Sequence, residues 1–255
     1  MDYTLQLTTT GQSFSCGAEE NILSAALRAG VTLPYGCRSG VCGSCKARLV
    51  TGSVDVGTYS PRALSEAERA QGHILLCQAR PLSALMIEPR SALPTTDYPV
   101  IRAPARVVKI ERLAARVIRL YLKLPDHADL RFRAGQYLNI ILRDGARRSF
   151  SIANPPHETA LLELHIGLHD AGVFTPHVFG SLQEKDILRL EAPYGEFYVR
   201  DDSTRPIVMV AGGTGFAPLK AMIEDAWIRG MRRPITLYWG ARDRAALYLD
   251  RVVRG

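Results

Sequence analysis

Four cysteines constrain this chain more than any other feature of its sequence. Cys37, Cys42 and Cys45 are separated by four and then two residues, and Cys77 follows inside an apolar run. Glycines lie among the first three, where a loop around a metal centre must turn sharply and bring backbone N–H groups close to it. Four thiolates in one place would repel one another strongly unless metal ions were bound. The spacing predicts that Cys37, Cys42, Cys45 and Cys77 are the ligands of a [2Fe-2S] cluster.

Other uses of these thiols fit the spacing less well. A structural zinc site usually has two short Cys-x-x-Cys pairs, whereas here one spacing is four and the last cysteine stands alone. A Rieske centre needs two histidines in ligand spacing, and none of the six histidines lies beside these cysteines. Disulfides would indicate secretion, and we see no signal peptide in residues 1–12. We expect the fifth cysteine, Cys16, to pack as a small apolar residue.

Composition and charge narrow the possible partners. The 255 residues are enough for two or three domains. Because no apolar run reaches the roughly 18 residues of a membrane span, we expect a cytoplasmic protein without a membrane partner. Residues 1–91 carry 8 basic and 7 acidic side chains and residues 105–200 carry 14 and 11, so the net charge of +7 comes mainly from the later segments. No basic block with interleaved aromatics is present, which favours phosphorylated cofactors over nucleic acid.

Residues 1–91 predict a domain of their own. Alternating side chains predict strands over residues 3–9 and 13–16, and an apolar stripe predicts a helix over residues 19–29. A strand over residues 46–50 follows the cysteine loop, and we expect a further strand to carry Cys77. Residues 92–104 contain regularly spaced prolines with Ser and Thr between them, and predict an extended linker between domains.

Residues 105–203 predict an antiparallel β-domain. Short alternating or β-branched runs, separated by turn residues, are dense enough for a small barrel, at residues 106–110, 117–124, 137–142, 148–153 and 161–168. Within it, Arg148 would pair with a phosphate, Phe150 would cover a flavin ring and Ser151 would hydrogen-bond the ring edge. Arg-x-Phe-Ser alone is equally consistent with an ordinary strand. Gly172 and Thr175 add to it, because they flank the start of a short helix whose free N–H groups would bind a pyrophosphate.

Residues 204–255 predict part of an α/β domain. An apolar strand over residues 206–211 ends in Gly212-Gly213-Thr214-Gly215, a helix over residues 216–230 follows, and then a strand over residues 235–240. A glycine-rich turn between a strand and a helix is typical of phosphate binding, although this one is not the Gly-x-Gly-x-x-Gly fingerprint.

These features, in this order, resemble the ferredoxin-NAD(P)H reductase family. The chain looks most like the iron-sulfur flavoprotein reductases that feed bacterial multicomponent oxygenases, and CDP-6-deoxy-hexose reductases share the same layout. The resemblance implies a multidomain fold of α+β and β parts: a β-grasp [2Fe-2S] ferredoxin domain of plant type, an antiparallel Greek-key FAD-binding β-barrel, and the first part of an α/β nicotinamide-binding domain.

The resemblance also implies which residues hold the cofactors. The expected flavin contacts are Arg148, Ser149, Phe150, Ser151, His165, Ile166, Gly172 and Thr175. NADH or NADPH would bind at Gly212, Gly213, Thr214 and Gly215, with Ser151 and Thr214 closest to the chemistry. Relatives often carry a basic residue where this chain has Gly167, which leaves FMN open as an alternative to FAD. We expect His165, His169 and His177 to pack or hydrogen-bond and not to bind a metal.

The implied function is that of an NAD(P)H-dependent electron-transfer reductase. A nicotinamide releases two electrons as one hydride, a [2Fe-2S] cluster takes one electron at a time, and a flavin converts between the two. Electrons would leave for a separate acceptor protein, such as an oxygenase component or a deoxysugar dehydrase. The alternatives are a ferredoxin-like one-electron carrier that no longer accepts hydride efficiently, and a zinc-stabilised binding module.

One expectation concerns the end of the chain. Relatives in the resembling family continue further, and residues 205–255 supply few elements to cover a parallel sheet. We therefore expect a truncated chain, whose residues 201–255 pack poorly or associate with another chain.

Overall fold

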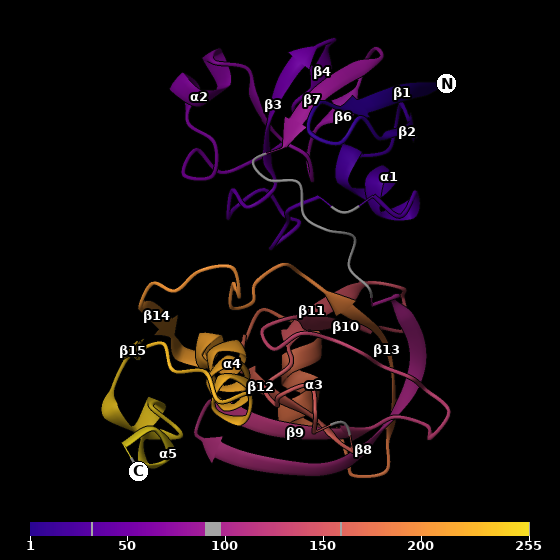
Figure 1. The fold of residues 1–255 in the computed structure, drawn as a ribbon. Helices are drawn as coiled ribbons and strands as arrows, with labels where there is room; N and C mark the ends of the chain where they lie inside the picture. The colour runs from indigo at the N-terminus through magenta and orange to yellow at the C-terminus, as the bar shows by residue number, and fades with distance from the viewer. Residues whose placement is uncertain (32, 90–97, 159, 255) are drawn as a thin grey trace. The chain divides into compact units, whose positions relative to one another are not determined.

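A computed structural model describes residues 1–31, 33–89, 98–158 and 160–254 (Figure 1). The chain divides into two compact units, Met1–Asp97 and Tyr98–Gly255. The division falls inside the stretch expected to be a linker, of which residues 92–97 lie outside the described residues.

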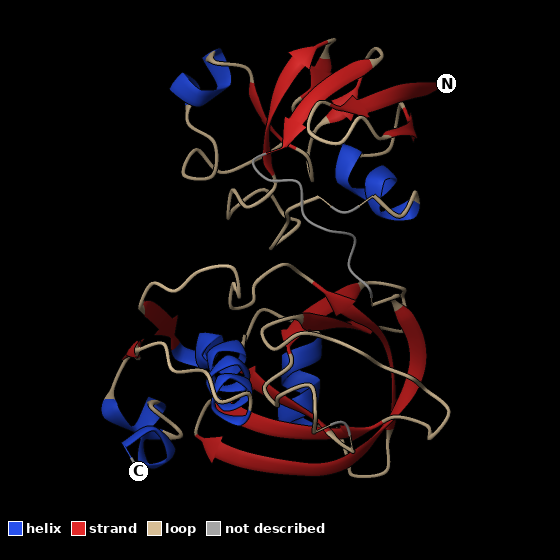
Figure 2. Cartoon of the chain, viewed as in Figure 1, coloured by secondary structure: helices blue, strands red, loops and turns tan. Residues whose placement is uncertain are grey.

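The first unit is built on a five-stranded sheet in the order β2-β1-β7-β3-β5. Strands β1 and β7 are parallel, and the other neighbours are antiparallel. A separate two-stranded ribbon pairs β4 with β6, and two helices complete the unit (Figure 2). The elements are β1 (Asp2–Leu7), β2 (Ser13–Gly17), α1 (Ile22–Arg28), β3 (Lys46–Thr51), β4 (Val54–Asp55), α2 (Glu66–Ala70), β5 (His73–Leu75), β6 (Arg80–Pro81) and β7 (Leu85–Pro89).

Helix α1 shows how local sequence sets an element boundary. The Asn21 side chain accepts a hydrogen bond from the Ser24 amide at 2.9 Å, which caps the first turn. Gly30 ends the helix, because its φ of +72° is a conformation that glycine adopts without a Cβ clash. The predicted start at residue 19 is wrong, since Asn21 supplies the cap and the residues before it form a turn.

Two further expectations for this unit need correction. Cys77 was expected on a strand, but it lies in the turn two residues after β5 ends at Leu75. A turn suits a ligand better, because a regular strand would point alternate side chains to opposite faces. Helix α2 was not predicted, although Ser65 and Glu68 form a capping box at its start, a sequence signature that identifies such a helix.

The second unit contains a six-stranded antiparallel barrel in the order β11-β10-β13-β8-β9-β12. A single bridge between Ile152 and Leu164 joins the two ends of this order. Strand β13 returns to lie between β10 and β8, which is a Greek-key connection. The strands, with helix α3 between the fifth and the sixth, are β8 (Ile101–Ala114), β9 (Val117–Lys123), β10 (Tyr137–Ile141), β11 (Arg147–Ser151), β12 (Leu162–Gly167), α3 (Phe174–Gly180) and β13 (Ile187–Tyr194).

The barrel is filled by apolar side chains that alternate along its strands. Leu120, Leu138, Leu164 and Leu190 are all fully buried in one continuous core, and Phe174 of α3 packs into the same core. Alternation along each strand sends the intervening side chains outward. On β12 this places Leu162, Leu164 and Ile166 inside the barrel and leaves the residues between them for the outer face.

Strand β8 begins at Ile101, so residues 101–104 are not linker as expected. Over this stretch β8 pairs with β13, with Pro104 opposite Arg189. Strand β9 pairs with β8 only from Arg106 onward, so the missing N–H group of Pro104 interrupts no second ladder. Strand β13 was not predicted, because its sequence mixes charged and apolar residues without clear alternation.

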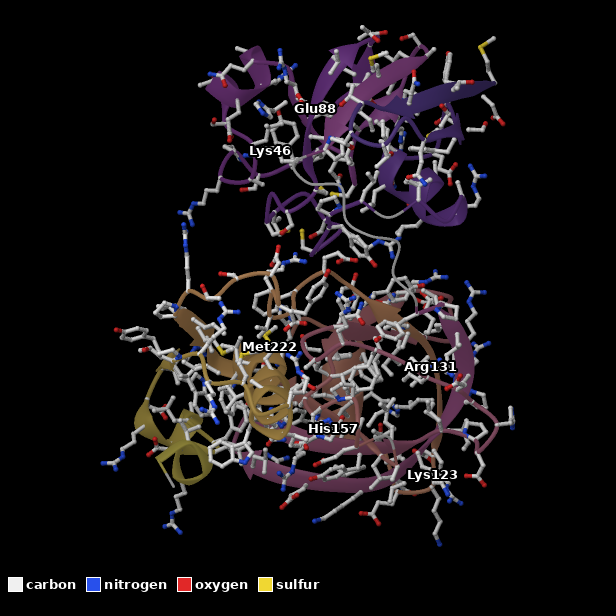
Figure 3. The ribbon with its side chains drawn as sticks, viewed as in Figure 1. Lys46, Glu88, Lys123, Arg131, His157 and Met222 are labelled. Carbon is white, nitrogen blue, oxygen red and sulfur yellow. The ribbon has the colours of Figure 1, made fainter. Side chains whose placement is uncertain are left out.

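The rest of the second unit has two parallel strands and a helix that packs on them. These are β14 (Ile207–Gly212), α4 (Phe216–Ile228) and β15 (Ile235–Gly240), with a short 3-10 turn over Gly213–Gly215 and a last helix α5 (Asp250–Arg254). Met209, Phe216, Leu219 and Met222 form a buried cluster; Met222 is labelled in Figure 3. The expectation that residues 201–255 pack poorly is therefore wrong for the inner side of this segment.

The outer side of the two-stranded sheet is different. Val208, Val210 and Tyr238 are exposed there, each by more than half of its surface. Among the helices that the structure describes, none is long and apolar enough to cross a membrane.

Candidate functional site

The cysteine loop of the first unit brings the four thiols together as two pairs. The Cys37 amide donates to Cys42 Sγ at 3.4 Å, and the thiols of Cys45 and Cys77 are hydrogen-bonded to each other. Cys37 and Cys42 are exposed, whereas Cys45 and Cys77 are buried. A [2Fe-2S] cluster takes two protein ligands on each iron, so two pairs are the donor set that it requires.

The loop around these thiols supplies backbone amides to the cysteine sulfurs. The amides of Ser39 and Ser44 donate to Cys37 Sγ and Cys42 Sγ at 3.4 and 3.5 Å. A Cβ on Gly43 would lie 2.9 Å from the Ala63 carbonyl, and the φ of Gly43 is +74°. Glycine is therefore required where the loop turns between its second and third ligands.

Charge explains why the thiols need metal. The hydrogen bond between the Cys45 and Cys77 thiols lowers the pKa of Cys77 to about 6. It raises the pKa of Cys45 well above its ordinary value. One thiolate of the pair therefore forms readily, and the second requires a neighbouring cation. No group of three or more His, Cys, Asp or Glu side chains that could hold one metal ion is found in the described part of the chain.

Two other residues of this unit, Lys46 and Cys16, are buried or nearly buried. Lys46, labelled in Figure 3, directly follows Cys45, is nearly buried, and pairs through its ammonium group with Glu68 of α2. Cys16 lies on β2 and is fully buried, and burial raises the pKa of its thiol to about 11. That thiol is therefore protonated and unreactive near neutral pH.

In the second unit, a cavity of about 560 Å³ collects most of the residues expected to contact a flavin. It lies between β11, the end of β12, the start of α3 and the turn before α4. Its lining includes Arg148, Ser149, Phe150, Ser151, His165, Gly167, His169, Gly172, Phe174, Thr175, Thr214, Gly215 and Ala217. An apolar wall with a few converging polar groups suits a planar ring that must also be oriented.

Individual side chains in this cavity have defined partners. Phe150 and Phe174 lie with ring centroids 5.5 Å apart. The Thr175 hydroxyl accepts from the His169 amide at 2.9 Å and donates to the His169 carbonyl at 3.0 Å, which closes the loop before α3. Ser149 donates to Asn139 Oδ1 at 2.7 Å. Ile166, also expected as a flavin contact, lies in the barrel core because it points to the opposite face of β12.

The turn before α4, where the nicotinamide dinucleotide is expected, lines the same cavity. Thr214 and Gly215 line the cavity with Ser151, and Gly212 and Gly213 lie beside it. A Cβ at Gly212, Gly213 or Gly215 would meet nothing within 4 Å, so the backbone of this turn is open to a ligand. Trp239 Nε1 donates to the Gly213 carbonyl at 2.9 Å and holds the turn in place.

Gly167 allows these two parts to approach each other. A Cβ there would lie 3.3 Å from Thr214 Cγ2, which is tighter than most contacts between carbon atoms. A larger side chain at this position would push Thr214 away or enter the cavity. Gly167, where relatives often carry a basic residue, thus lies where β12 closely approaches the turn before α4.

A buried polar network lies next to the cavity and was not expected from the sequence. It joins Glu163 and His165 on β12 to Lys220 on α4 and to Tyr248 after β15. Only His165 was a candidate beforehand. The local sequence gives no signal for it, since Glu163 and His165 alternate with core leucines as outward-facing strand residues do, yet the structure buries them.

Comparison with known proteins agrees with this organisation. A 2Fe-2S iron-sulfur cluster binding domain matches residues 5–82, an oxidoreductase FAD-binding domain matches residues 104–198, and an oxidoreductase NAD-binding domain matches residues 209–254. The chain is 37% identical over 253 residues to the reductase component 1 of terephthalate 1,2-dioxygenase from Comamonas sp., covering 99% of this chain and 74% of that protein.

Two further relatives have the same layout. The CDP-6-deoxy-L-threo-D-glycero-4-hexulose-3-dehydrase reductase of Yersinia pestis is 36% identical over 250 residues, which cover 98% of this chain and 75% of that one. The crystal structure of the Amycolatopsis cytochrome P450 reductase GcoB superposes with a TM-score of 0.80 at 35% identity, covering 99% of this chain and 76% of that one. The chain therefore belongs to the iron-sulfur flavoprotein reductases of the ferredoxin-NAD(P)H reductase family, which pass electrons from NAD(P)H through FAD to a [2Fe-2S] cluster.

Proposed function

We propose that this chain is the reductase component of a multicomponent system and delivers electrons to a separate oxygenase component or deoxysugar dehydrase. The observation that carries the proposal is the single cavity lined by both Ser151 of the barrel and Thr214 of the nucleotide-binding turn. A flavin ring held on one side would there meet a nicotinamide held on the other. The relatives in oxygenase and dehydrase systems support the kind of partner.

We assign the cofactor contacts by their position around that cavity. Arg148 and the start of α3, at Gly172 and Thr175, are suited to the FAD phosphates. Phe150 is suited to the ring face, and Ser149 and Ser151 are suited to its polar edge. The open turn from Gly212 to Gly215 is suited to the nicotinamide dinucleotide.

The residues of this chain position the flavin and the nicotinamide and exclude solvent from them. When bound, the flavin supplies the exchange between a two-electron hydride and single electrons. Ser151 and Thr214 both line the cavity, and we propose that their hydroxyl groups orient the two rings. Cys37, Cys42, Cys45 and Cys77 hold the cluster that receives the electrons. A cytoplasmic location is part of the proposal, because thiolate ligands and NAD(P)H both suit a reducing compartment.

Anaerobic titration tests the main proposal. The purified chain should contain iron, inorganic sulfide and FAD, and NADH or NADPH should bleach both the flavin and the iron-sulfur absorbance. Dithionite reduces the cluster of a reductase and of a one-electron carrier alike, so it serves as the reference. A chain that dithionite reduces but neither nicotinamide reduces would be a one-electron carrier, and a colourless chain would be a zinc module.

Two variants test the site assignment. Replacing Ser151 or Thr214 by alanine should slow flavin reduction by NADH by about tenfold, the effect of losing one orienting hydrogen bond. Dithionite reduction of the cluster should not change. The matched control is Ser203→Ala, which removes a hydroxyl from a loop outside the cavity. Unchanged flavin reduction in both variants would contradict the assigned roles.

A further inference from the structure

The two ring nitrogens of His165 are both already bound to protein groups. Nδ1 lies 2.9 Å from the Tyr248 hydroxyl, and Nε2 lies 2.8 Å from Glu163 Oε1. The side chain is fully buried. Because a carboxylate only accepts hydrogen bonds, Nε2 carries the proton, and in the neutral imidazole Nδ1 then accepts from the Tyr248 hydroxyl group. The imidazole has no remaining nitrogen with which to hydrogen-bond a flavin.

Glu163 extends the same network to a second element. Its Oε2 atom accepts from Lys220 Nζ at 3.2 Å, and Lys220 also contacts Glu224 at 2.9 Å and the Ala153 carbonyl at 3.3 Å. Arg119 of β9 lies 3.8 Å from Glu163 on the other side. The carboxylate is buried but is compensated by two cations and an imidazole N–H group, the condition under which such burial is tolerated.

The network therefore connects β12 by hydrogen bonds to two other segments. Lys220 comes from α4 and Tyr248 from the segment after β15, and both reach adjacent outward-facing residues of one barrel strand. The Tyr248 ring stands edge-on to His165 at 5.2 Å and to Trp239 at 5.1 Å. Trp239 in turn stacks on Phe216 at 4.0 Å. An apolar wall thus shields the polar chain from water and strengthens its hydrogen bonds.

This wall also connects to the turn that lines the cavity. Trp239 donates to the Gly213 carbonyl, and Phe216 is the first residue of α4, directly after Gly215. Displacing Tyr248 would remove one support of Trp239 and so of the turn. The position of Thr214 relative to Ser151 thus depends on contacts made at His165.

We propose that Tyr248, His165, Glu163 and Lys220 form a latch that holds the nucleotide-binding half against the barrel, and that His165 is a positioning residue and not a flavin contact. The proposal rests on the function proposed above, because its consequence is the alignment of nicotinamide with flavin. It assigns a role to four residues outside the glycine-rich turn and the Arg-x-Phe-Ser strand.

The test uses the full chain with Tyr248→Phe, which keeps the ring and removes only the hydroxyl group. Backbone amide exchange in α4 should become about fivefold faster, and flavin reduction by NADH about tenfold slower, because one buried acceptor loses its partner. The dissociation constant for FAD should stay within about twofold, since Tyr248 does not line the flavin cavity and both ring nitrogens of His165 are bound to protein groups. Tyr238→Phe is the matched control, because Tyr238 lies on the neighbouring strand with its side chain exposed.

Glu163→Gln gives an independent second variant. It should speed exchange in α4 in the same way, and the double variant with Tyr248→Phe should show less than the sum of the two effects, because both act through one imidazole. A tenfold loss of FAD affinity in Tyr248→Phe would overturn the proposal and make His165 a flavin contact. Unchanged amide exchange, or unchanged flavin reduction despite faster exchange, would overturn it as well.

The exchange measurement separates this proposal from the proposed function. It needs no turnover and can be made on the chain before any nicotinamide is added. If NADH did not reduce the flavin of the parent chain, the proposed function would fail while exchange and FAD affinity would still decide the latch.

Discussion

A single missing side chain sets how closely the two halves of the flavin cavity approach. At Gly167 the nearest atom to an added Cβ would be Thr214 Cγ2, at 3.3 Å. No positive φ accompanies this glycine, so the restriction is one of space and not of backbone conformation. The contact atom is a methyl group, which makes the restriction testable by removing that methyl.

We predict that Gly167→Ala lowers the free energy of unfolding by about 1 kcal/mol, the usual cost of mild overpacking. Adding Thr214→Ser should recover most of this loss, because serine keeps the hydroxyl and lacks Cγ2. Urea unfolding followed by flavin fluorescence would measure both. An equal loss in the single and double variants would show that the alanine strains something other than Thr214.

Glu196 is a second residue whose environment is unusual. Its carboxyl group is nine-tenths buried, and its Oε2 atom has no hydrogen-bond partner among the described residues. Burial raises the pKa of this carboxyl, although Tyr198 hydrogen-bonds it and Arg200 and Arg133 lie nearby. A raised pKa means that the folded state holds the proton more tightly than the unfolded chain, so the stabilising effect is present below about pH 4.5 and is lost as the pH rises through the folded value.

Glu196→Gln should therefore raise the free energy of unfolding at pH 7 by about 1 kcal/mol, because the amide carries no charge into the buried site. At pH 4 the difference from the parent should shrink toward zero. Urea unfolding at both pH values provides the measurement. Asp202→Asn, an exposed carboxylate in the same unit, is the control and should change stability little at either pH. A stabilisation that is equal at both pH values would mean that charge burial is not its cause.

At the scale of elements, the contact between β12 and α4 should weaken in acid. Burial lowers the pKa of His165, and it is opposed by the hydrogen bond to Glu163. Burial alone would raise the pKa of Glu163, but the His165 hydrogen bond and the Lys220 charge lower it overall. Both groups bind protons more weakly in the folded chain, so both contribute stability that is lost as the pH falls. The other ionisable groups that face this pair are Arg119, Tyr121, Glu224 and Tyr248.

Comparing the parent with a variant isolates the effect of His165 on stability. The comparison is needed because burial raises the pKa of Glu224, whose titration changes stability with pH in the opposite direction. The stability difference between the parent and His165→Gln should decrease as the pH falls below the ordinary His value of 6.5. Amide exchange in α4 at pH 7.5 and pH 5.5 is the measurement. If the stability difference between the parent and His165→Gln is the same at both pH values, protonation of His165 does not weaken the contact between β12 and α4.

Much of this architecture could be predicted, because the relevant signals are local. The cysteine spacing, the alternation of β9 and β12 and the strand-turn-helix around Gly213 each lie within one short stretch. Strand β13 and the latch could not be predicted in the same way. His165 and Tyr248 lie 83 positions apart, and Lys220 lies 57 positions from Glu163. Nothing in the local sequence at any of these residues indicates that their side chains meet.

The same limit applied to single side chains at the site. The resemblance placed Ile166 at the flavin together with His165, but neighbouring residues on a strand point to opposite faces, and the Ile166 side chain lies in the core. The start of α1 was misplaced by its acidic residues, whereas the Asn21 cap determines it. Alternation and capping therefore predict the direction of a side chain better than adjacency in sequence does.

For the whole molecule, the two kinds of redox centre belong to different units. All four cluster thiols lie in Met1–Asp97, and every residue lining the flavin cavity lies in Tyr98–Gly255. Each unit has its own apolar core. Two units with separate cores can lose one cofactor without losing the other.

We therefore predict that Cys42→Ser abolishes the iron-sulfur absorbance and the delivery of electrons to a one-electron acceptor such as cytochrome c. Flavin reduction by NADH should stay within about twofold of the parent, because the cluster and the flavin cavity lie in units with separate cores. Cys16→Ala is the matched control: its thiol is buried and donates weakly to the Glu20 carbonyl, so the cluster should remain. Stopped-flow absorbance at flavin and cluster wavelengths measures each step, and the flavin content shows whether the second unit has folded. A large fall in flavin reduction with full flavin content would mean that the cluster unit controls hydride transfer, and the two units could not then be treated as independent modules.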